Sequence, residues 1–273
     1  MMSLIRGVEL EQSFIRSRNK DKTELIFFVN AGDPSMEVTF EILRVLAKHK
    51  VATVELCIPF PNSLTDGPLI KASHKRALNN GVDLHSVLNL VRRARNELAL
   101  SIVILADYAH TVKPLGIKDF LRLCLTAGAS GTLIHCLPSS QRKYYVDESE
   151  NLGLGRIMSF FAGSNHETRD QAYQDAEGFI YVVSQFGKTG NKVIFDRAKL
   201  DQLTAIREET KKPLAIGFGV KTATDVSKIR QTGVDAVIIG SAATAIVENN
   251  LNAPDQIVPC FNRLVKELSS ACC

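Results

Sequence analysis

Short apolar runs alternate with amphipathic stretches along most of the chain. Each run is rich in Ile, Val, Leu and Phe and is too short to form a helix, so it predicts a buried strand. The eight runs occupy residues 25–32, 51–58, 101–108, 131–137, 156–163, 178–185, 213–219 and 235–242. Apolar residues spaced by three and four predict helices over residues 36–49, 84–98, 117–128, 197–212 and 223–233.

Strands that alternate with helices indicate a parallel sheet with helical crossovers. Eight such units in 273 residues predict an α/β fold of one type, a single (β/α)8 TIM barrel. An open, doubly wound sheet is the alternative, but the first strand is followed by NAGDP rather than by the GxGxxG fingerprint. The chain has no internal linker, so we expect one domain over residues 1–273. Helices at about 1–20 and about 254–270 would pack on the barrel.

Composition and charge narrow the classes of function. The 33 basic and 29 acidic residues are dispersed without a basic stripe, so we expect no nucleic-acid partner. No apolar segment approaches the length of about 18 residues that a membrane span needs, and the first residues lack the apolar core of a signal peptide. We therefore expect no membrane partner and a cytoplasmic location. The six cysteines form no CxxC pair, which argues against structural zinc or disulfides.

Glu55 stands in the middle of the second predicted strand. Side chains alternate along a strand, so Thr53, Glu55 and Cys57 would face the barrel axis. Reactive groups of such barrels lie at the carboxyl ends of the strands. A carboxyl group in an apolar mouth has a raised pKa and can exchange protons near neutral pH, so Glu55 is a candidate general acid and base. The alternative is a structural carboxylate bridged to a lysine or a backbone amide.

Asp66 follows in the loop after the same strand, two residues before Pro68. It would bring a second carboxylate to the mouth from the same strand–helix unit. The alternative is a local role, because Asp favours the position that caps a helix and proline favours its first turn.

Two glycine-containing strand ends suggest a site for a phosphate group. GFG at residues 217–219 and GSA at residues 240–242 each precede a predicted helix, and Ser241 adds a hydroxyl group. Glycine lets backbone N–H groups approach an anion, and a helix N-terminus adds partial positive charge. GKTG at residues 187–190 would add further amides. The alternative is that these glycines only form tight turns.

Six stretches together resemble the α chain family of tryptophan synthase. They are FFVNAGDP, VELCIPFPNSLTDGP, DYAH, SQFGKTG, GFGV and IIGSA, spaced as in the family from about residue 20 to about residue 265. The resemblance implies a (β/α)8 barrel without a cofactor that belongs to tryptophan biosynthesis. The implied reaction is the retro-aldol cleavage of indole-3-glycerol phosphate to indole and glyceraldehyde 3-phosphate. The implied partner is a β chain in an α2β2 complex, and a stand-alone enzyme is the alternative.

The resemblance also implies roles for particular residues. Glu55 would protonate the indole carbon from which the side chain leaves, and Asp66 would receive the indole N–H. Tyr181 would lie beside Glu55, and Thr189 would order Asp66. The other matched positions are Phe28 and Tyr108 near the indole, and Gly190, Phe218, Gly219, Gly240 and Ser241 around the phosphate.

Several residues depart from the family pattern. Asn62 and Ser63 stand where the family usually has an acidic residue near its β chain, which favours a role without that partner. His135 and Cys136 replace a small residue and an acid after the fourth strand, and Asp107 follows the third strand. Either His135 is a hydrogen-bonded core residue, or it gathers with Asp107 and His110 at the mouth and binds a polar substrate. A metal site formed by these three residues is a further alternative, although we expect none.

Three hypotheses follow from the sequence. The first is the indole-releasing lyase. The second is a lyase or isomerase of the same barrel that acts on a different phosphorylated substrate, which the presence of His135 and Asp107 motivates. The third is a non-catalytic chain that activates a β-type enzyme.

Overall fold

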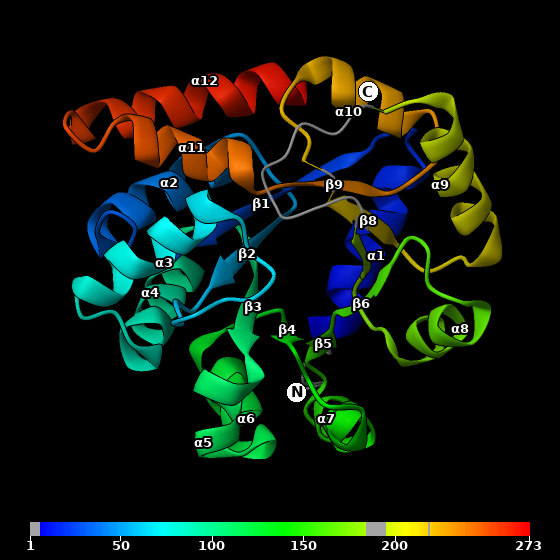
Figure 1. The fold of residues 1–273 in the computed structure, drawn as a ribbon, viewed down its shortest axis with the longest axis horizontal. Coiled ribbons are helices and arrows are strands. Elements are labelled where there is room, and N and C mark those ends of the chain that lie inside the picture. The colour runs from blue at the N-terminus through cyan, green and yellow to red at the C-terminus, as the bar shows by residue number, and fades with distance from the viewer. Residues whose placement is uncertain (1–5, 184–194, 218) are drawn as a thin grey trace.

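Parallel strands form a nearly closed barrel that is surrounded by helices (Figure 1). The computed structural model describes residues 6–183, 195–217 and 219–273. Within this part of the chain the strands are β1 (Glu24–Asn30), β2 (Thr53–Cys57), β3 (Ser101–Asp107), β4 (Gly131–His135), β5 (Gly155–Arg156), β6 (Met158–Phe161), β7 (Ile180–Val183), β8 (Leu214–Gly217) and β9 (Ala236–Ile239).

The strand order confirms the predicted barrel. Strand β1 pairs with β2 on one side and with the last strand, β9, on the other, as closure requires. The two ends of the sheet are β5 and β6, which are consecutive pieces of one predicted strand interrupted at Ile157. The Ile157 N–H donates to the carbonyl of Thr132 on β4 (3.0 Å). An open doubly wound sheet is therefore wrong.

The helices cover the outside of the barrel, as Figure 1 shows. They are α1 (Arg6–Arg18), α2 (Met36–Lys48), α3 (Pro68–Asn79), α4 (Leu84–Glu97), α5 (Lys113–Leu115), α6 (Ile117–Ala127), α7 (Ser139–Leu152), α8 (His166–Asp175), α9 (Arg197–Glu209), α10 (Ala223–Arg230), α11 (Ser241–Asn249) and α12 (Ile257–Ser269), with a π-helical turn η1 (Tyr108–Val112) and a 3-10 turn η2 (Pro254–Gln256). The five helices predicted from spacing are present. Helices α7 and α8 escaped prediction because they bury only Tyr145, Ser149 and Ala172 and so carry almost no apolar stripe.

Two hydrophobic layers lie on either side of the strands. Val54 and Leu56 of β2 belong to the outer layer, between strands and helices. Glu55 lies between them in sequence and is in register with Val103, which belongs to the inner layer. The alternation predicted for this strand is thus present, and Glu55 faces the interior of the barrel.

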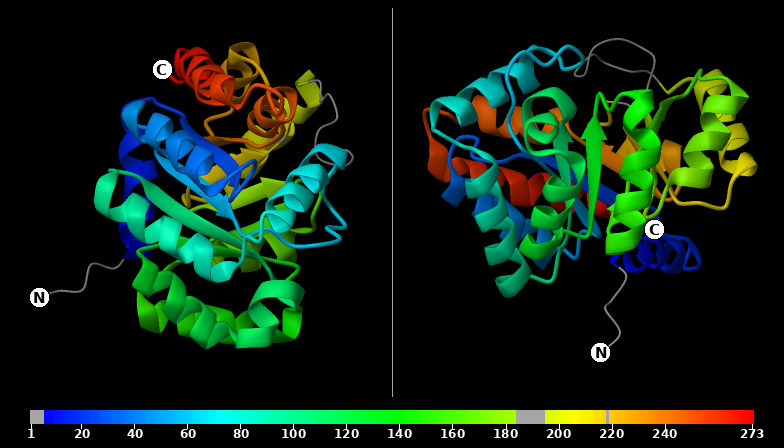
Figure 2. Two further views of the ribbon diagram at one scale, coloured as in Figure 1. Left: turned by 90° about the vertical axis from the view of Figure 1, so that its left-hand side faces the viewer. Right: turned by 90° about the horizontal axis from the view of Figure 1, so that it is seen from below.

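Helix α1 closes the amino-terminal end of the barrel. Its Leu10 and Phe14 belong to the inner layer, where the ring of Phe14 meets that of Phe179 with centroids 5.5 Å apart. Figure 2 (right) shows α1 at the opposite end of the barrel from the cyan loop that leads into α3.

Helix α12 starts three residues later than predicted because η2 precedes it, and residues 1–5 of the predicted first helix lie outside the described residues. The assignment of the whole chain to one domain stays a prediction.

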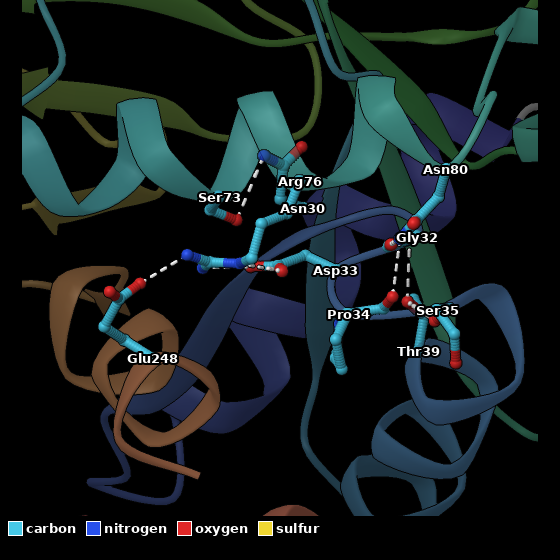
Figure 3. A network of polar contacts seen from close by, with 10 residues as sticks. All are labelled: Asn30, Gly32, Asp33, Pro34, Ser35, Thr39, Ser73, Arg76, Asn80 and Glu248. Carbon is cyan, nitrogen blue, oxygen red and sulfur yellow. Dashed lines mark hydrogen bonds and ion pairs between the residues drawn. The ribbon is translucent and has the colours of Figure 1, made fainter. Parts of the chain in front are cut away.

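A polar network ties α3 to the β1–α2 loop and to α11 (Figure 3). Buried Asp33 accepts two hydrogen bonds from the guanidinium of Arg76 (2.7 and 2.9 Å). Arg76 also donates to Glu248 on α11. One turn further along α3, Asn80 donates to two carbonyl groups of the β1–α2 loop (2.6 and 3.2 Å). The Arg76 guanidinium contacts a different carboxylate at each of its ends, and Asn80 adds two further bonds. Together these contacts hold α3 in a fixed position at the open end of the barrel.

At the closed end, the carboxylate of Asp235 is fully buried between two arginines. Its oxygens lie 2.5 Å from Arg207 on α9 and 3.1 Å from Arg18 on α1. It also accepts a hydrogen bond from the backbone N–H of Leu214 (2.9 Å). Removal of one partner of a buried ion pair leaves a poorly compensated charge in a medium of low dielectric constant.

We expect Arg207→Met to lower the free energy of unfolding by about 3 kcal/mol, because Asp235 then keeps Arg18 as its one charged partner among the described residues. Urea unfolding measures the change. Arg197→Met is the matched control, since Arg197 lies on the same helix and is exposed; its effect should stay within about 0.5 kcal/mol. Equal effects of the two substitutions would contradict this account of the closed end.

Candidate active site

The open end of the barrel is lined by inward-facing residues from the carboxyl ends of the strands. Their positions follow from the strand registers and from the inner layer below them. They are Phe28, Glu55, Asp107, His135, Tyr181 and Gly217. Predicted catalytic and substrate-binding residues from five different strands therefore share one mouth, as is usual for this fold.

Among the residues that the structure describes, Glu55 is a buried carboxyl group without a charged partner. Its side chain is 1% exposed, and within the described residues its Oε1 atom has no hydrogen-bond partner. Burial raises the pKa of Glu55 to about 8. The alternative of a lysine or amide bridge finds no support among the described residues. A carboxyl group with this pKa is mostly protonated at pH 7 and can donate its proton.

Tyr181 lies beside this carboxyl group. Burial raises the pKa of the Tyr181 hydroxyl, and the negative charges of Glu55 and Asp66 raise it further, so the hydroxyl stays protonated. The ring fills the space next to Gly217, where an added Cβ atom would lie 2.3 Å from the Tyr181 hydroxyl oxygen. A glycine at this position therefore allows the tyrosine to reach the mouth.

Asp66 behaves in the opposite way to Glu55. Burial raises the pKa of Asp66, but hydrogen bonds from His74 and Ser63 outweigh that effect, so the pKa falls below its usual value. The Ser63 hydroxyl donates to Oδ2 (2.7 Å), and His74 Nε2 lies 3.3 Å from the same oxygen. Helix α3 begins with Gly67 as its N-cap residue, so the alternative that Asp66 caps this helix is wrong.

The mouth thus holds two carboxyl groups in different protonation states. Glu55 is neutral at pH 7 and Asp66 is ionised, although both come from one strand–helix unit. In their ionised forms both raise the pKa of Tyr181 and that of the buried Cys57 thiol, so the two carboxyl groups adjoin the same small space. Separated pKa values of this kind allow one group to donate a proton while the other stabilises positive charge.

Two of the predicted phosphate positions, Gly240 and Ser241, form the amino-terminal end of α11. Gly240 is the N-cap residue of this helix and makes no side-chain capping bond, and Ser241 is its buried first residue. The first turn contains no acidic side chain, so its N–H groups suit an anion. Gly240 adjoins Phe28 of the neighbouring strand, and Gly219 after β8 has a positive φ of 71°. Thr189, Gly190 and Phe218 lie outside the described residues.

Three histidine rings surround the buried ring of Phe60. The ring centroids of His74, His110 and His135 lie 4.5, 6.1 and 6.3 Å from that of Phe60. Asp107 accepts from Nδ1 of His110 (2.6 Å), and His135 Nε2 lies 3.1 Å from the Thr65 hydroxyl. The predicted gathering of His135, Asp107 and His110 at the mouth is therefore present. Over the ranges that the structure covers, no group of three His, Cys, Asp or Glu residues is arranged to hold a metal ion.

Tyr108 packs on the outer side of the strands, whereas Phe28, Glu55 and Tyr181 face the mouth. It begins the π-helical turn η1 directly after β3, and its half-buried ring packs against the outer hydrophobic layer. The preceding residue, Asp107, takes the inward-facing position. The structure thus places a carboxylate at this strand end, with the tyrosine behind it.

A family model described as "Tryptophan synthase alpha chain" matches residues 14–272. The chain belongs to the tryptophan synthase alpha chain family. The alpha chain of Polynucleobacter asymbioticus is 33% identical over 250 residues, which cover 92% of this chain and 93% of that protein. The Arabidopsis thaliana alpha chain is 28% identical and covers 97% of this chain and 95% of its own.

Solved structures agree in fold with this assignment to the alpha chain family. The tryptophan synthase A-subunit of Pyrococcus furiosus superposes with a TM-score of 0.83 at 26% identity, covering 91% of this chain and 98% of that one. A Mycobacterium tuberculosis tryptophan synthase chain has a TM-score of 0.86 at 23% identity, covering 96% and 97%. The family predicted from six short stretches is confirmed, as are the TIM barrel and the lyase. The roles of individual residues stay predictions.

His74 and Ser63 are site residues that sequence reasoning missed as partners of Asp66. His74 sits in the amphipathic helix α3, and Ser63 was read only as a departure from the alpha chain pattern near a partner surface. One signal was available: His74 lies in the second turn of α3, and Asp66 lies just before the N-cap residue of the same helix. Spacing alone does not reveal that the imidazole points back toward the carboxylate.

We expect Glu55→Gln to stabilise the fold by about 2 kcal/mol at pH 7.5. In the unfolded chain this carboxyl group has a pKa of about 4.3, whereas the folded value is about 8, so folding must protonate it. The folded wild type binds more protons, so its stability falls as pH rises from about 4.3 to about 8. The neutral amide escapes this loss, although its own unpaired N–H groups offset part of the gain.

Urea unfolding at pH 5 and pH 7.5 measures this difference. The gap between Glu55→Gln and the wild type should widen toward the higher pH. Glu208→Gln on the exposed face of α9 is the matched control and should show no such trend. A gap that stays constant would mean that Glu55 is ionised in the folded protein.

Proposed function

We propose that this chain cleaves indole-3-glycerol phosphate into indole and glyceraldehyde 3-phosphate by acid and base catalysis. The observation that carries the proposal is the pair formed by neutral Glu55 and ionised Asp66 at one mouth, next to the uncapped N-terminus of α11. Membership of the tryptophan synthase alpha chain family supports the substrate.

In the proposed reaction, Glu55 first donates its proton to the indole carbon that carries the glycerol phosphate side chain. Protonation is needed because indole is a poor leaving group as a carbanion. The positive charge that develops spreads to the ring nitrogen, whose N–H donates to the Asp66 carboxylate. A positioned general acid contributes a factor of about 10² to 10⁴ to the rate.

The bond between the ring and the side chain then breaks. Its electron pair returns to the ring and restores the aromatic indole, while the side-chain carbon becomes the aldehyde carbon. The ionised Glu55 takes the proton of the adjacent hydroxyl group, so the acid is regenerated at the end of the cycle. Every proton in this scheme moves through the chain's own side chains, and the scheme needs no cofactor.

The phosphate group of the substrate is proposed to bind at the N-terminus of α11. Gly240 and Ser241 supply N–H groups there, and the Ser241 hydroxyl adds a further donor. Phe28 of the neighbouring strand lies next to Gly240, since a Cβ atom added there would lie 3.8 Å from the Phe28 Cβ atom. The distance between phosphate and ring in the substrate would then direct the indole toward Glu55.

A β chain is the proposed partner. The loop between β2 and α3 exposes Leu64 to 84%, beside a hollow of about 490 Å³ that Lys71 and Lys75 help to line. The same loop carries Ser63 and Asp66, so a partner bound there would sit directly outside the active site. Among the helices that the structure describes, none is long and apolar enough to span a bilayer. A cytoplasmic location stays a prediction.

A second candidate substrate is a phosphorylated compound with a more polar ring. Asp107 is 5% exposed at the mouth and is paired with His110, and His135 lies across the strand register from it. These groups would bind a hydroxyl or amino substituent at the edge of the ring. A higher kcat/KM for a ring-hydroxylated indole-3-glycerol phosphate than for the unsubstituted compound would favour this candidate.

We expect the purified wild type to release indole from indole-3-glycerol phosphate, alone or with a β chain. Glu55→Gln should reduce kcat by at least about 10²-fold. Because the neutral carboxyl group donates the proton, kcat/KM should fall as pH rises through about 8. Indole release measured by colour or fluorescence from pH 5 to 9.5 tests both points.

Glu208→Gln serves again as the control and should keep wild-type activity. No indole from the wild type under either condition would refute the proposal. If Glu55→Gln supported a β chain supplied with indole as well as the wild type did, while the wild type released none, the chain would be an activator rather than a lyase.

A further inference from the structure

The carboxylate of Asp66 is held through one of its two oxygens. The Ser63 hydroxyl and His74 Nε2 both approach Oδ2, at 2.7 and 3.3 Å. Among the described residues no side chain donates to Oδ1. The backbone N–H of Asp66 also lies 3.4 Å from the Ser63 hydroxyl, which closes a tight local turn. One oxygen is thus fixed by two side chains of the same strand–helix unit.

Its surroundings determine the tautomer of His74. The backbone N–H of Phe60 donates to Nδ1 of the imidazole (3.3 Å), so Nδ1 must be the unprotonated acceptor. The ring proton is then on Nε2, which donates to Asp66. The ring is 3% exposed and rests against the ring of Phe60, with centroids 4.5 Å apart. Two hydrogen bonds and one ring contact leave this imidazole a single orientation.

The helix that carries His74 is itself anchored on both sides. Its neighbour Ser73 accepts a hydrogen bond from Asn30 of β1 (3.2 Å), and Arg76 joins Asp33 to Glu248 two residues later. Figure 3 shows this anchorage between the β1–α2 loop, α3 and α11. A donor on so rigid an element fixes the carboxylate before any ligand is bound.

We propose that His74 and Ser63 are positioning residues. Their hydrogen bonds to Oδ2 keep Asp66 ionised and fix the orientation of its carboxylate, so that Oδ1 receives the ring N–H of the substrate. This inference rests on the proposed function. It assigns the orientation of Asp66 to its own strand–helix unit, through a neutral imidazole and a hydroxyl group, and these residues need not touch the substrate.

Other titratable groups also face Asp66 across the mouth. They come from β2, from the end of β4 and from β7, and are Cys57, His135, Cys136 and Tyr181. The variants below change only donors to Oδ2, so a difference between variant and wild type isolates these two hydrogen bonds.

The first experiment titrates Asp66 in the folded, substrate-free protein by carboxyl 13C NMR. Ser63→Ala and His74→Phe each remove one donor to the carboxylate, so each should raise the pKa of Asp66, by about one unit. His74→Gln places an amide N–H near the position of Nε2 and should restore most of the wild-type value. Ser140→Ala on α7 and His85→Phe on α4, both exposed, are the matched controls and should leave the titration unchanged.

The second experiment measures indole release from indole-3-glycerol phosphate with the same variants. Ser63→Ala and His74→Phe should each lower kcat/KM by about 10-fold and move its acidic limb to higher pH, because Asp66 must be ionised. A loss of general stability would lower activity without moving the limb. If His74→Phe fails to fold, Ser63→Ala and His74→Gln still decide the matter.

An unchanged Asp66 titration in Ser63→Ala together with an unmoved limb would overturn the inference. Failure of the proposed function gives a different result. In that case the wild type releases no indole, whereas the 13C titration still reports whether His74 and Ser63 hold Asp66.

Discussion

The buried carboxyl group of Glu55 is the constraint on which the rest of the site depends. A carboxylate with no partner costs several kcal/mol in an apolar interior, so the group is held neutral up to a pH of about 8. That state persists only if the interior of the barrel stays dry and closed around it. Helix α1 below, the nearly closed ring of paired strands and the close contact of Gly217 with Tyr181 all serve this closure.

Asp66 carries the same carboxyl group as Glu55, but its pKa is lowered rather than raised. It lies in a loop, where hydroxyl and imidazole donors replace water. The hydrogen bonds overcome its partial burial and keep it ionised. An acid and an anion can thus be built from two carboxyl groups without any metal ion or cofactor, because environment rather than residue type sets their roles.

Much of the fold was predictable because it depends on periodicity. Alternation in residues 51–58 placed Glu55 inside the barrel, and helical spacing located α2, α4, α6, α9 and α10 within a few residues. Helices α7 and α8 were not predictable, since they bury too few apolar residues to leave a pattern. The donors to Asp66 escaped for another reason. Hydrogen bonds between side chains depend on rotamers and loop geometry, which no residue spacing encodes.

Two departures from the family pattern, Ser63 and His135, make side-chain contacts around the mouth of the barrel. Ser63 was suspected of weakening a partner surface, but its side chain turns inward to Asp66. His74, His110 and His135 arise from three different elements and all meet the ring of Phe60. A cluster of this kind changes the polarity of one wall of the mouth while the Glu55 wall stays apolar. The polar side chains of this wall lie beside Asp66, whereas Glu55 stays buried without a hydrogen-bond partner for its Oε1 atom among the described residues.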